Sequence, residues 1–128
     1  MAEGIGAGRL VLLIEDEPNI AEAIRFILMR DGWRVTHLDE GTGAVARVRD
    51  TAPDLLILDL MLPGMSGLEI LVDLRADPGT AGLPVLMLSA KGLARDREAA
   101  ERAGASHFMT KPFSNAEMLA QVRALASP

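Results

Sequence analysis

The sequence contains no cysteine and no tyrosine, and its aromatic residues are limited to one tryptophan and three phenylalanines. Without cysteine the chain can form no disulfide bond and no thiolate metal site, which is compatible with a reducing compartment. Its apolar runs are far too short to cross a bilayer, and its start, MAEGIGAGRL, lacks the basic and apolar regions of a signal peptide. We therefore expect a cytoplasmic protein without a membrane partner.

A basic surface is also lacking, because the formal net charge is −5. This charge argues mildly against nucleic acid as a direct partner, since phosphate backbones favour basic patches. The chain of 128 residues is long enough for one domain with a substantial core, and it shows no internal repeat or low-complexity segment. We expect a flexible N-terminal tail at residues 1–8 and a single domain at residues 9–128.

Five short apolar segments alternate with five segments of helical character. Strands are expected at residues 9–14, 33–38, 55–58, 84–88 and 107–110. Apolar residues at helical spacing mark the intervening and final helices: Ile20, Ile24, Ile27 and Leu28; Val45 and Val48; Leu68, Leu71 and Val72; Ala99, Ala100 and Ala103; Met118, Val122 and Leu125. Ser114 and Glu117 form a capping-box pattern at the start of the last helix.

This alternation predicts an α/β fold, a doubly wound (βα)5 three-layer sandwich in which helices cover both faces of a parallel sheet. The first, third and fourth strands are continuously apolar and suit the centre of the sheet, whereas the second and fifth are more polar and suit its edges. The strand order 2-1-3-4-5 satisfies this distribution. In such a sheet, ligands bind beyond the carboxyl ends of the strands, at the switch point between strands one and three.

Polar side chains gather at those carboxyl ends. Glu15 and Asp16 follow the first strand, Asp59 the third, Ser89 the fourth and Lys111 the fifth. Crowded carboxylates raise one another's pKa unless a cation lies among them, and oxygen ligands without nearby histidine or cysteine favour Mg²⁺. With such a metal, Asp59 can stay ionised and attack phosphorus, which gives an aspartyl phosphate. Lys111 and the Ser89 hydroxyl would then cover the remaining phosphoryl oxygens.

Four segments together resemble the receiver domain of bacterial two-component response regulators, in particular stand-alone receivers of the chemotaxis-regulator type: LLIEDEP, LLILDLMLPGMSG, VLMLSA and GASHFMTKPF. The similarity extends from about Leu10 to Leu125. It implies a flavodoxin-like fold, with Asp59 as the phosphoacceptor. It also implies that Asp16, Asp59 and the backbone carbonyl of Met61 bind Mg²⁺ directly, while Glu15 acts largely through water.

The resemblance further implies roles for residues near the fourth and fifth strands. Ser89 and Lys111 match the hydroxyl and the lysine that bind the phosphoryl group. Phe108 matches the switch aromatic, which turns inward when the hydroxyl residue moves toward the phosphate. The Lys111–Pro112 peptide bond is expected to be cis.

As a function, the resemblance implies a phosphorylation-activated signalling switch in a phosphorelay. A sensor histidine kinase or a histidine phosphotransfer protein would donate the phosphoryl group from a phosphohistidine. The domain would be a regulatory phosphoacceptor rather than an enzyme, although it promotes its own phosphotransfer and autodephosphorylation. It would signal to a downstream target protein through its fourth helix, fifth strand and fifth helix, as a monomer or weak dimer.

Each residue alone also has an ordinary interpretation. Asp59 can be turn chemistry, Asp16 and Glu17 can cap the first helix, and Phe108 can belong to the core. Two sets of side chains carry no functional expectation: those of the methionines at 61, 65, 87, 109 and 118 are expected to fill core and loops, and those of His37 and His107 to lie on the surface of edge strands. The joint occurrence of five polar residues at one edge of the sheet favours the functional interpretation.

Other functions fit the same topology less well. An aspartate-nucleophile phosphatase would need a general acid two residues after Asp59, where this chain has Met61. A flavin-binding loop would be rich in serine, threonine and glycine, whereas the loop here reads EDEPN. Two alternatives remain open: a degenerate receiver that binds proteins independently of phosphorylation, and a receiver fragment of a longer regulator or hybrid kinase.

Overall fold

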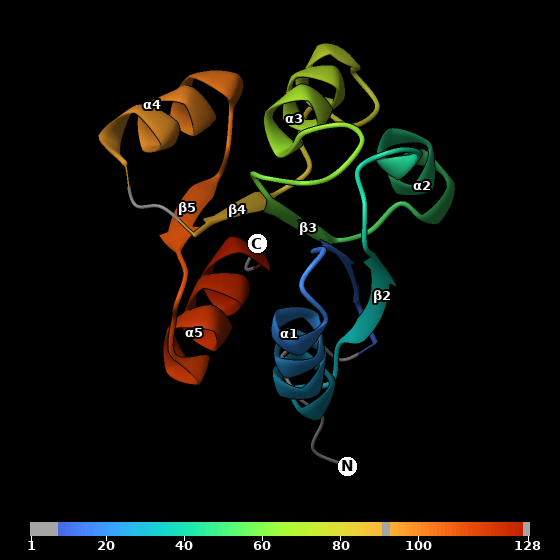
Figure 1. Cartoon of the computed structure of the whole chain (residues 1–128). Helices are drawn as coiled ribbons and strands as arrows, with labels where there is room; N and C mark the ends of the chain where they lie inside the picture. The colour runs from blue at the N-terminus through green and yellow to red at the C-terminus, as the bar shows by residue number, and fades with distance from the viewer. Residues whose placement is uncertain (1–7, 91–92, 127–128) are drawn as a thin grey trace.

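The computed structural model describes residues 8–90 and 93–126 of the chain. In these residues five strands alternate with five helices (Figure 1). Their bounds are β1 Leu10–Ile14, α1 Pro18–Arg30, β2 Arg34–Leu38, α2 Ala44–Thr51, β3 Leu55–Asp59, α3 Gly67–Ala76, β4 Val85–Ser89, α4 Ala94–Ala103, β5 His107–Thr110 and α5 Asn115–Ala126. The α/β alternation predicted from the sequence is therefore confirmed.

The sheet has the strand order β2-β1-β3-β4-β5, and every neighbouring pair is parallel. All residues of β1, β3 and β4 are buried, which fits their continuous aliphatic sequences and their central positions. The edge strands β2 and β5 are only partly buried. The predicted order and the predicted assignment of centre and edges are both confirmed.

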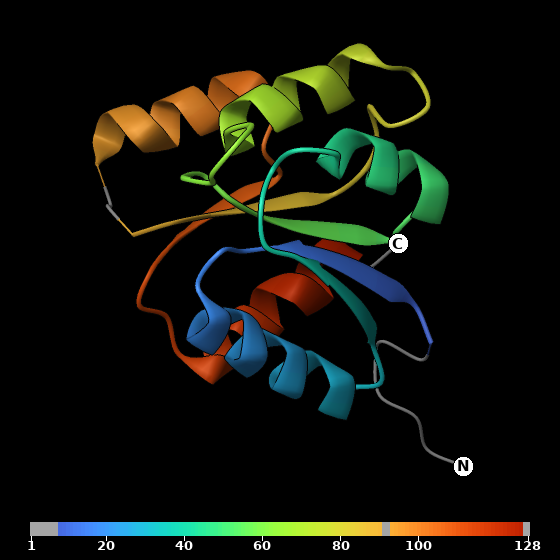
Figure 2. The same cartoon turned by 45° about the vertical axis from the view of Figure 1, so that its right-hand side comes forward.

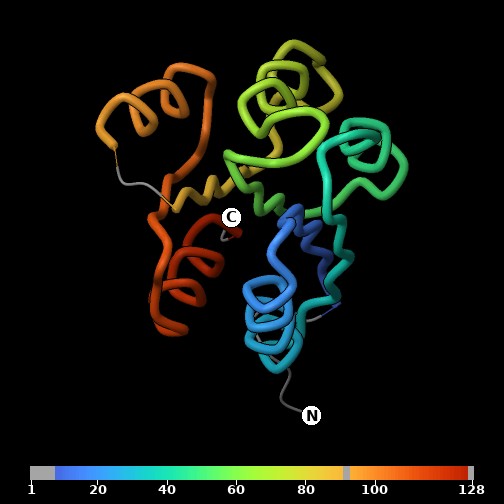
Figure 3. The backbone as a smooth tube through the Cα atoms, viewed as in Figure 1, coloured from blue at the N-terminus to red at the C-terminus, as the bar shows by residue number. Residues whose placement is uncertain are grey.

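Helices cover both faces of this sheet, so that the fold has three layers. Helices α1 and α5 lie on one face, and α2, α3 and α4 lie on the other (Figures 1 and 2). Because side chains alternate along each strand, the sheet contributes to two separate apolar clusters, one beneath each helical layer. Each crossover returns the chain to a parallel strand, which places the carboxyl ends of all five strands at one edge of the sheet (Figure 1). Figure 3 traces the same chain path as a tube.

The helix starts follow from local sequence. Pro18 occupies the first turn of α1, where its missing N–H is not needed. Ser66 and Glu69 form a reciprocal capping box at the start of α3. At α5, the Glu117 N–H donates to Ser114 Oγ at 3.0 Å, and the Ser114 N–H donates to Glu117 at 3.1 Å. These last two bonds confirm the capping box predicted for this helix.

The three residues that mark helix α3 in the sequence differ in burial. Leu71 is buried and Leu68 is half-buried, but Val72 is 54% exposed. The buried face of α3 instead consists of Gly67, Ile70, Leu71 and Leu74. All four residues follow the i, i+3, i+4, i+7 spacing of one helix face, whereas Val72 lies on the opposite side. The helix predicted from Leu68, Leu71 and Val72 is confirmed, and Val72 lies on its exposed side.

Two other features bear on earlier expectations. Residues 1–7 of the expected N-terminal tail lie outside the described residues, as do residues 127–128. Gly8 is described, and its N–H donates to the carbonyl of Gly32 at 2.9 Å.

Within the described part of the chain, none of the helices is long and apolar enough to span a membrane.

Candidate functional site

Four polar side chains are buried where the central and fifth strands end. Glu15 directly follows β1, Asp59 and Ser89 are the last residues of β3 and β4, and Lys111 directly follows β5. All four are less than a tenth exposed. Since the parallel strands end at one edge, the topology brings together residues that are up to 96 positions apart in sequence. The structure thus supports the predicted clustering of these groups.

The Lys111 ammonium is the centre of this cluster. Its Nζ lies 2.8 Å from Glu15 Oε1 and 3.2 Å from Asp59 Oδ2, and both carboxylates are almost fully buried. A third carboxylate, that of the more exposed Glu17, lies 3.4 Å from the same nitrogen. Burial lowers the pKa of Lys111, but the bonds and charges of Glu15 and Asp59 outweigh burial, and the net effect is a raised pKa. Lys111 therefore stays protonated.

Asp59 is held in an unfavourable environment for a carboxylate. Burial first, and then the charge of Glu15, raise its pKa from 3.8 to about 7, although the Met61 N–H and Lys111 act in the opposite direction. Because folding raises this pKa, the contribution of Asp59 to stability decreases as the pH rises from 3.8 toward 7. One lysine does not fully compensate the two buried acids, so the site favours an additional cation.

The backbone around Asp59 fixes the position of its carboxylate. The Met61 N–H donates to Asp59 Oδ1 at 3.1 Å, while the Leu60 N–H donates to Leu88 on β4 at 2.8 Å. Gly67 begins α3 directly against the Asp59 carbonyl, and a side chain at this position would collide with that oxygen. The glycine thus lets the N-terminus of α3 pack against the end of β3.

The donor set fits a divalent cation. Carboxylate oxygens of Glu15, Asp16 and Glu17 all lie within 4.8 Å of one another. These hard oxygen atoms match the preference of Mg²⁺ for oxygen ligands, and a cation here would offset the burial and the Glu15 charge that raise the pKa of Asp59. Met61 lies two residues after Asp59, and the Met61 side chain is 71% exposed. The predicted ligands Glu15, Asp16, Asp59 and Met61 are therefore located along the β1 and β3 ends.

Sequence reasoning gave no site role to two residues that contact this cluster. Capping of α1 was one ordinary interpretation of Glu17; the residue occupies the N-cap position, but its side chain makes no capping hydrogen bond and pairs with Lys111 instead. His37 on the edge strand β2 is half-buried, and its Nε2 lies 2.7 Å from the Glu15 carbonyl oxygen. Because a carbonyl only accepts, His37 Nε2 must donate this bond. His37 is therefore on an edge strand and partly exposed, as expected, and its hydrogen bond to the Glu15 carbonyl is the feature that the sequence did not predict.

The remaining predicted residues lie next to this centre. The Ser89 side chain is buried, and its carbonyl accepts a hydrogen bond from the Lys111 N–H at 2.7 Å. Phe108 is buried in β5 among core residues, with the Arg97 guanidinium of α4 lying 4.8 Å from its ring centroid. The peptide bond between Lys111 and Pro112 is cis. This bond directly follows the lysine that enters the site.

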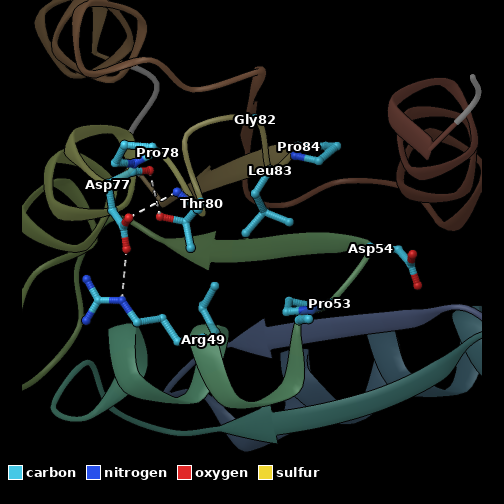
Figure 4. Close-up of a pocket in the computed structure, with 12 residues that line it drawn as sticks. Arg49, Pro53, Asp54, Asp77, Pro78, Thr80, Gly82, Leu83 and Pro84 are labelled. Atoms are coloured by element: carbon cyan, nitrogen blue, oxygen red, sulfur yellow. Dashed lines mark hydrogen bonds and ion pairs between the residues drawn. The ribbon is translucent and has the colours of Figure 1, made fainter.

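A cavity of about 580 Å³ lies at the opposite edge of the sheet, near the starts of β3 and β4 (Figure 4). Pro53 and Pro84 line it, and Arg49 Nε donates to Asp77 at 3.0 Å at its rim. The Gly79 N–H first and then Arg49 lower the pKa of Asp77. No residue of the predicted site lines this cavity. Its position at the amino ends of the strands separates it from the acidic cluster.

The doubly wound sheet and the buried acids paired with one lysine at its carboxyl edge define the class of receiver-like α/β domains. Residues 11–123 match the response regulator receiver domain family, so the chain belongs to this family. Members of the family are regulatory phosphoacceptors of two-component signalling systems, and they bind Mg²⁺ through an acidic pocket. The predicted family is confirmed.

Curated relatives support the same assignment. TcrX of Mycobacterium tuberculosis is 44% identical over 115 residues, which cover 90% of this chain and 48% of that protein. The phosphate regulon transcriptional regulatory protein PhoB of Escherichia coli is 37% identical over 117 residues, which cover 91% of this chain and 51% of PhoB. The chain therefore spans about half the length of these relatives.

Solved structures agree with the fold. A chain from Chloroflexus aurantiacus superposes with a TM-score of 0.90 at 30% identity, over 94% of this chain and 99% of that one. The BeF3-activated N-terminal receiver domain of RstA from Klebsiella pneumoniae has a TM-score of 0.85 at 25% identity, over 94% of this chain and all of that one. The flavodoxin-like fold predicted from the sequence is confirmed.

Proposed function

We propose that the chain is a phosphorylation-activated switch, in which Asp59 accepts a phosphoryl group from a phosphohistidine. The donor is a sensor histidine kinase or a histidine phosphotransfer protein that acts in the cytoplasm. One observation carries this proposal: the ammonium of Lys111 bridges Glu15 and Asp59, yet the pKa of Asp59 still rises to about 7. The carboxylate of Asp59 is thus held in a fixed position, but its charge is only partly neutralised. Both properties suit a nucleophile that binds a cation and then attacks a phosphoryl group.

Each group around Asp59 has a role in this reaction. Asp59 Oδ2 or Oδ1 forms the new bond to phosphorus while the bond from phosphorus to the histidine nitrogen breaks. Lys111 pairs with one phosphoryl oxygen, and the Ser89 hydroxyl donates to another. Asp16, Asp59 and the Met61 carbonyl would hold Mg²⁺ directly, and Glu15 would hold it through water. The ion supplies positive charge that neutralises the carboxylates and the transferred group.

The signal to a downstream protein depends on helix α4, which is weakly anchored to the sheet. Ala100 is the one fully buried residue described in this helix, so few contacts hold α4 against the sheet. When Ser89 moves toward the phosphoryl group, Phe108 and the Arg97 above it repack, and the surface formed by α4, β5 and α5 changes. A downstream protein recognises this altered surface, and hydrolysis of the aspartyl phosphate by the domain itself resets it.

The setting of the domain is a further part of the proposal. The curated relatives are about twice as long as the matched region, and one of them, from Mycolicibacterium smegmatis, is named the DNA-binding response regulator MtrA. A receiver of this kind can control an output domain in the same protein or dock on a separate target. We favour a receiver that contacts no nucleic acid itself and acts as a monomer or weak dimer.

Acetyl phosphate tests the reaction without a cognate kinase. Wild-type protein incubated with acetyl phosphate and Mg²⁺ should gain the mass of one phosphoryl group, as measured by intact mass spectrometry. The same incubation with excess EDTA should give no adduct, because the carboxylates and the phosphoryl group then repel one another. An adduct that forms equally well in EDTA would contradict the proposed role of the acidic cluster.

A further inference from the structure

Helix α3 and the loop before it carry apolar side chains that are exposed or, for Met65 and Leu68, only partly packed against the core. Val72 is 54% exposed and Met61, in the loop before the helix, is 71% exposed. Met65 and Leu68 lie between them and are half-buried. Leu68 and Val72 are one helical turn apart and lie on one side of α3, and Met61 and Met65 belong to the loop that enters this helix. We call these four residues the α3 stripe, and three of them, Met65, Leu68 and Val72, line a shallow groove of about 420 Å³.

Acidic side chains line the same groove. Glu69 and Asp73 directly follow Leu68 and Val72, so an acidic row with i,i+4 spacing runs beside an apolar row with the same spacing. Glu69 accepts a hydrogen bond from the Ser66 N–H, whereas the Asp73 side chain has no hydrogen bond or ion pair among residues 8–90 and 93–126. From residue 50 to residue 74 the sequence contains five carboxylates and no lysine or arginine.

Both rows are unfavourable for the isolated domain. Like charges at i,i+4 repel each other, and Asp73 lies in the last turn of α3, where the helix dipole disfavours a negative charge. The exposed apolar row adds an unfavourable contact with water. A partner that brings apolar side chains and positive charge would relieve all three effects. A second copy of this surface would not, because it would oppose acids to acids.

We propose that the α3 stripe and its acidic row form a docking surface for a basic amphipathic helix of another protein. The apolar face of that helix packs on Leu68 and Val72, and its lysine or arginine side chains pair with Glu69 and Asp73. The surface adjoins the phosphoacceptor, because Met61 belongs to the stripe and its N–H donates to Asp59. The proposed docking does not require phosphorylation, and it is separate from the α4–β5–α5 surface.

A synthetic probe tests this surface directly. We would titrate ¹⁵N-labelled protein with a helical peptide of about 18 residues that has a leucine face and lysine elsewhere. The largest chemical-shift changes should fall at residues 61–73, and a matched peptide with glutamate in place of lysine should bind at least about tenfold more weakly. Binding centred on the exposed Phe26 and Met29 of α1, or equal binding of both peptides, would overturn the proposal.

Two variants separate docking from folding. Asp73→Lys should weaken the lysine peptide about threefold or more, while it raises Tm by about 2 to 4 °C because it removes a repulsion. Val72→Ser should weaken binding without loss of the folded spectrum, since Val72 is half exposed. Asp50→Lys is the matched control, because Asp50 is exposed near the end of α2 and does not line the groove. An equal effect of Asp50→Lys and Asp73→Lys would contradict specific docking.

The test is independent of the phosphorelay proposal. Asp59→Asn protein should bind the lysine peptide with the wild-type affinity, because Asp59 itself is buried and does not line the groove. Failure of acetyl phosphate to modify Asp59 would therefore leave the docking result intact. Conversely, loss of peptide binding in Asp59→Asn would show that the stripe depends on the phosphoacceptor, which contradicts the separation proposed here.

Discussion

Replacement of Asp59 by asparagine is expected to abolish phosphorylation by acetyl phosphate. Asparagine keeps the size of the side chain and can still accept the Met61 N–H, but its amide is not a nucleophile toward phosphorus. The variant should stay folded and should be more stable than wild type at pH 8, because it removes a buried carboxylate whose pKa is raised. Intact mass after incubation with acetyl phosphate and Mg²⁺ provides the measurement.

Asp54→Asn is the matched control for this substitution. Asp54 directly precedes β3, at the end of the strand opposite to Asp59, and its carboxylate accepts the Leu10 N–H at 2.8 Å. The same chemical change at this position should leave phosphorylation at the wild-type level. A phosphoryl adduct on Asp59→Asn, or its loss in Asp54→Asn, would show that the phosphoacceptor has been misassigned.

Replacement of Lys111 by methionine is expected to cause the largest loss of stability. The substitution removes the ammonium that lies 2.8 Å from Glu15 and 3.2 Å from Asp59, and it leaves two buried acids facing each other. Removal of one partner from a buried ion pair destabilises a protein by about 3 kcal/mol or more at neutral pH. Urea unfolding followed by circular dichroism measures the difference. The deficit should become smaller at pH 5, where protonation of Asp59 relieves the repulsion.

An exposed ion pair provides the comparison for Lys111. Arg25 pairs with Glu22 at 3.2 Å on the surface of α1. Arg25→Met removes the same charge, but solvent screens this pair, so the loss should stay below about 1 kcal/mol. Equal effects of Arg25→Met and Lys111→Met would mean that Lys111 does not neutralise a buried acidic site.

The fold was predictable because its signals are local and repeated. A continuous aliphatic segment, such as residues 55–58 of β3, predicts a central strand, and the more polar sequences of β2 and β5 predict edge strands. Parallel topology then brings the strand ends together without any knowledge of side-chain contacts. For the same reason the clustering of Glu15, Asp59 and Lys111 could be expected from their positions after strands.

What the sequence did not reveal depends on long-range geometry. Glu17 is adjacent to the expected ligands, but only the structure shows that it pairs with Lys111, 94 residues away, rather than capping α1. His37 on β2 contacts the Glu15 carbonyl at the end of the neighbouring strand β1, and no local sequence pattern predicts this contact. The outward position of Val72 is different, since the helical period of the buried Ile70, Leu71 and Leu74 was available in the sequence.

The methionines at 61, 65, 87, 109 and 118 lie in the core and in the loop between β3 and α3, as expected from the sequence. Met87, Met109 and Met118 fill the core as expected, whereas Met61 is largely exposed and Met65 is half-buried. Methionine adapts to either environment, so residue type alone does not distinguish a core position from a contact surface. The neighbouring acidic row makes this distinction, and it became visible once α3 was oriented on the sheet.

The central claim is that the buried carboxylate of Asp59 forms part of a cation site. The ionisation of Asp59 tests this claim most directly. The measurement is a pH titration of the Asp59 side-chain carboxyl carbon by ¹³C NMR, with and without Mg²⁺, assigned by comparison with Asp59→Asn. Without metal the pKa should be about 7, and saturating Mg²⁺ should lower it markedly, because the ion favours the charged form. A pKa near the ordinary value of 3.8 that does not respond to Mg²⁺ would contradict the account.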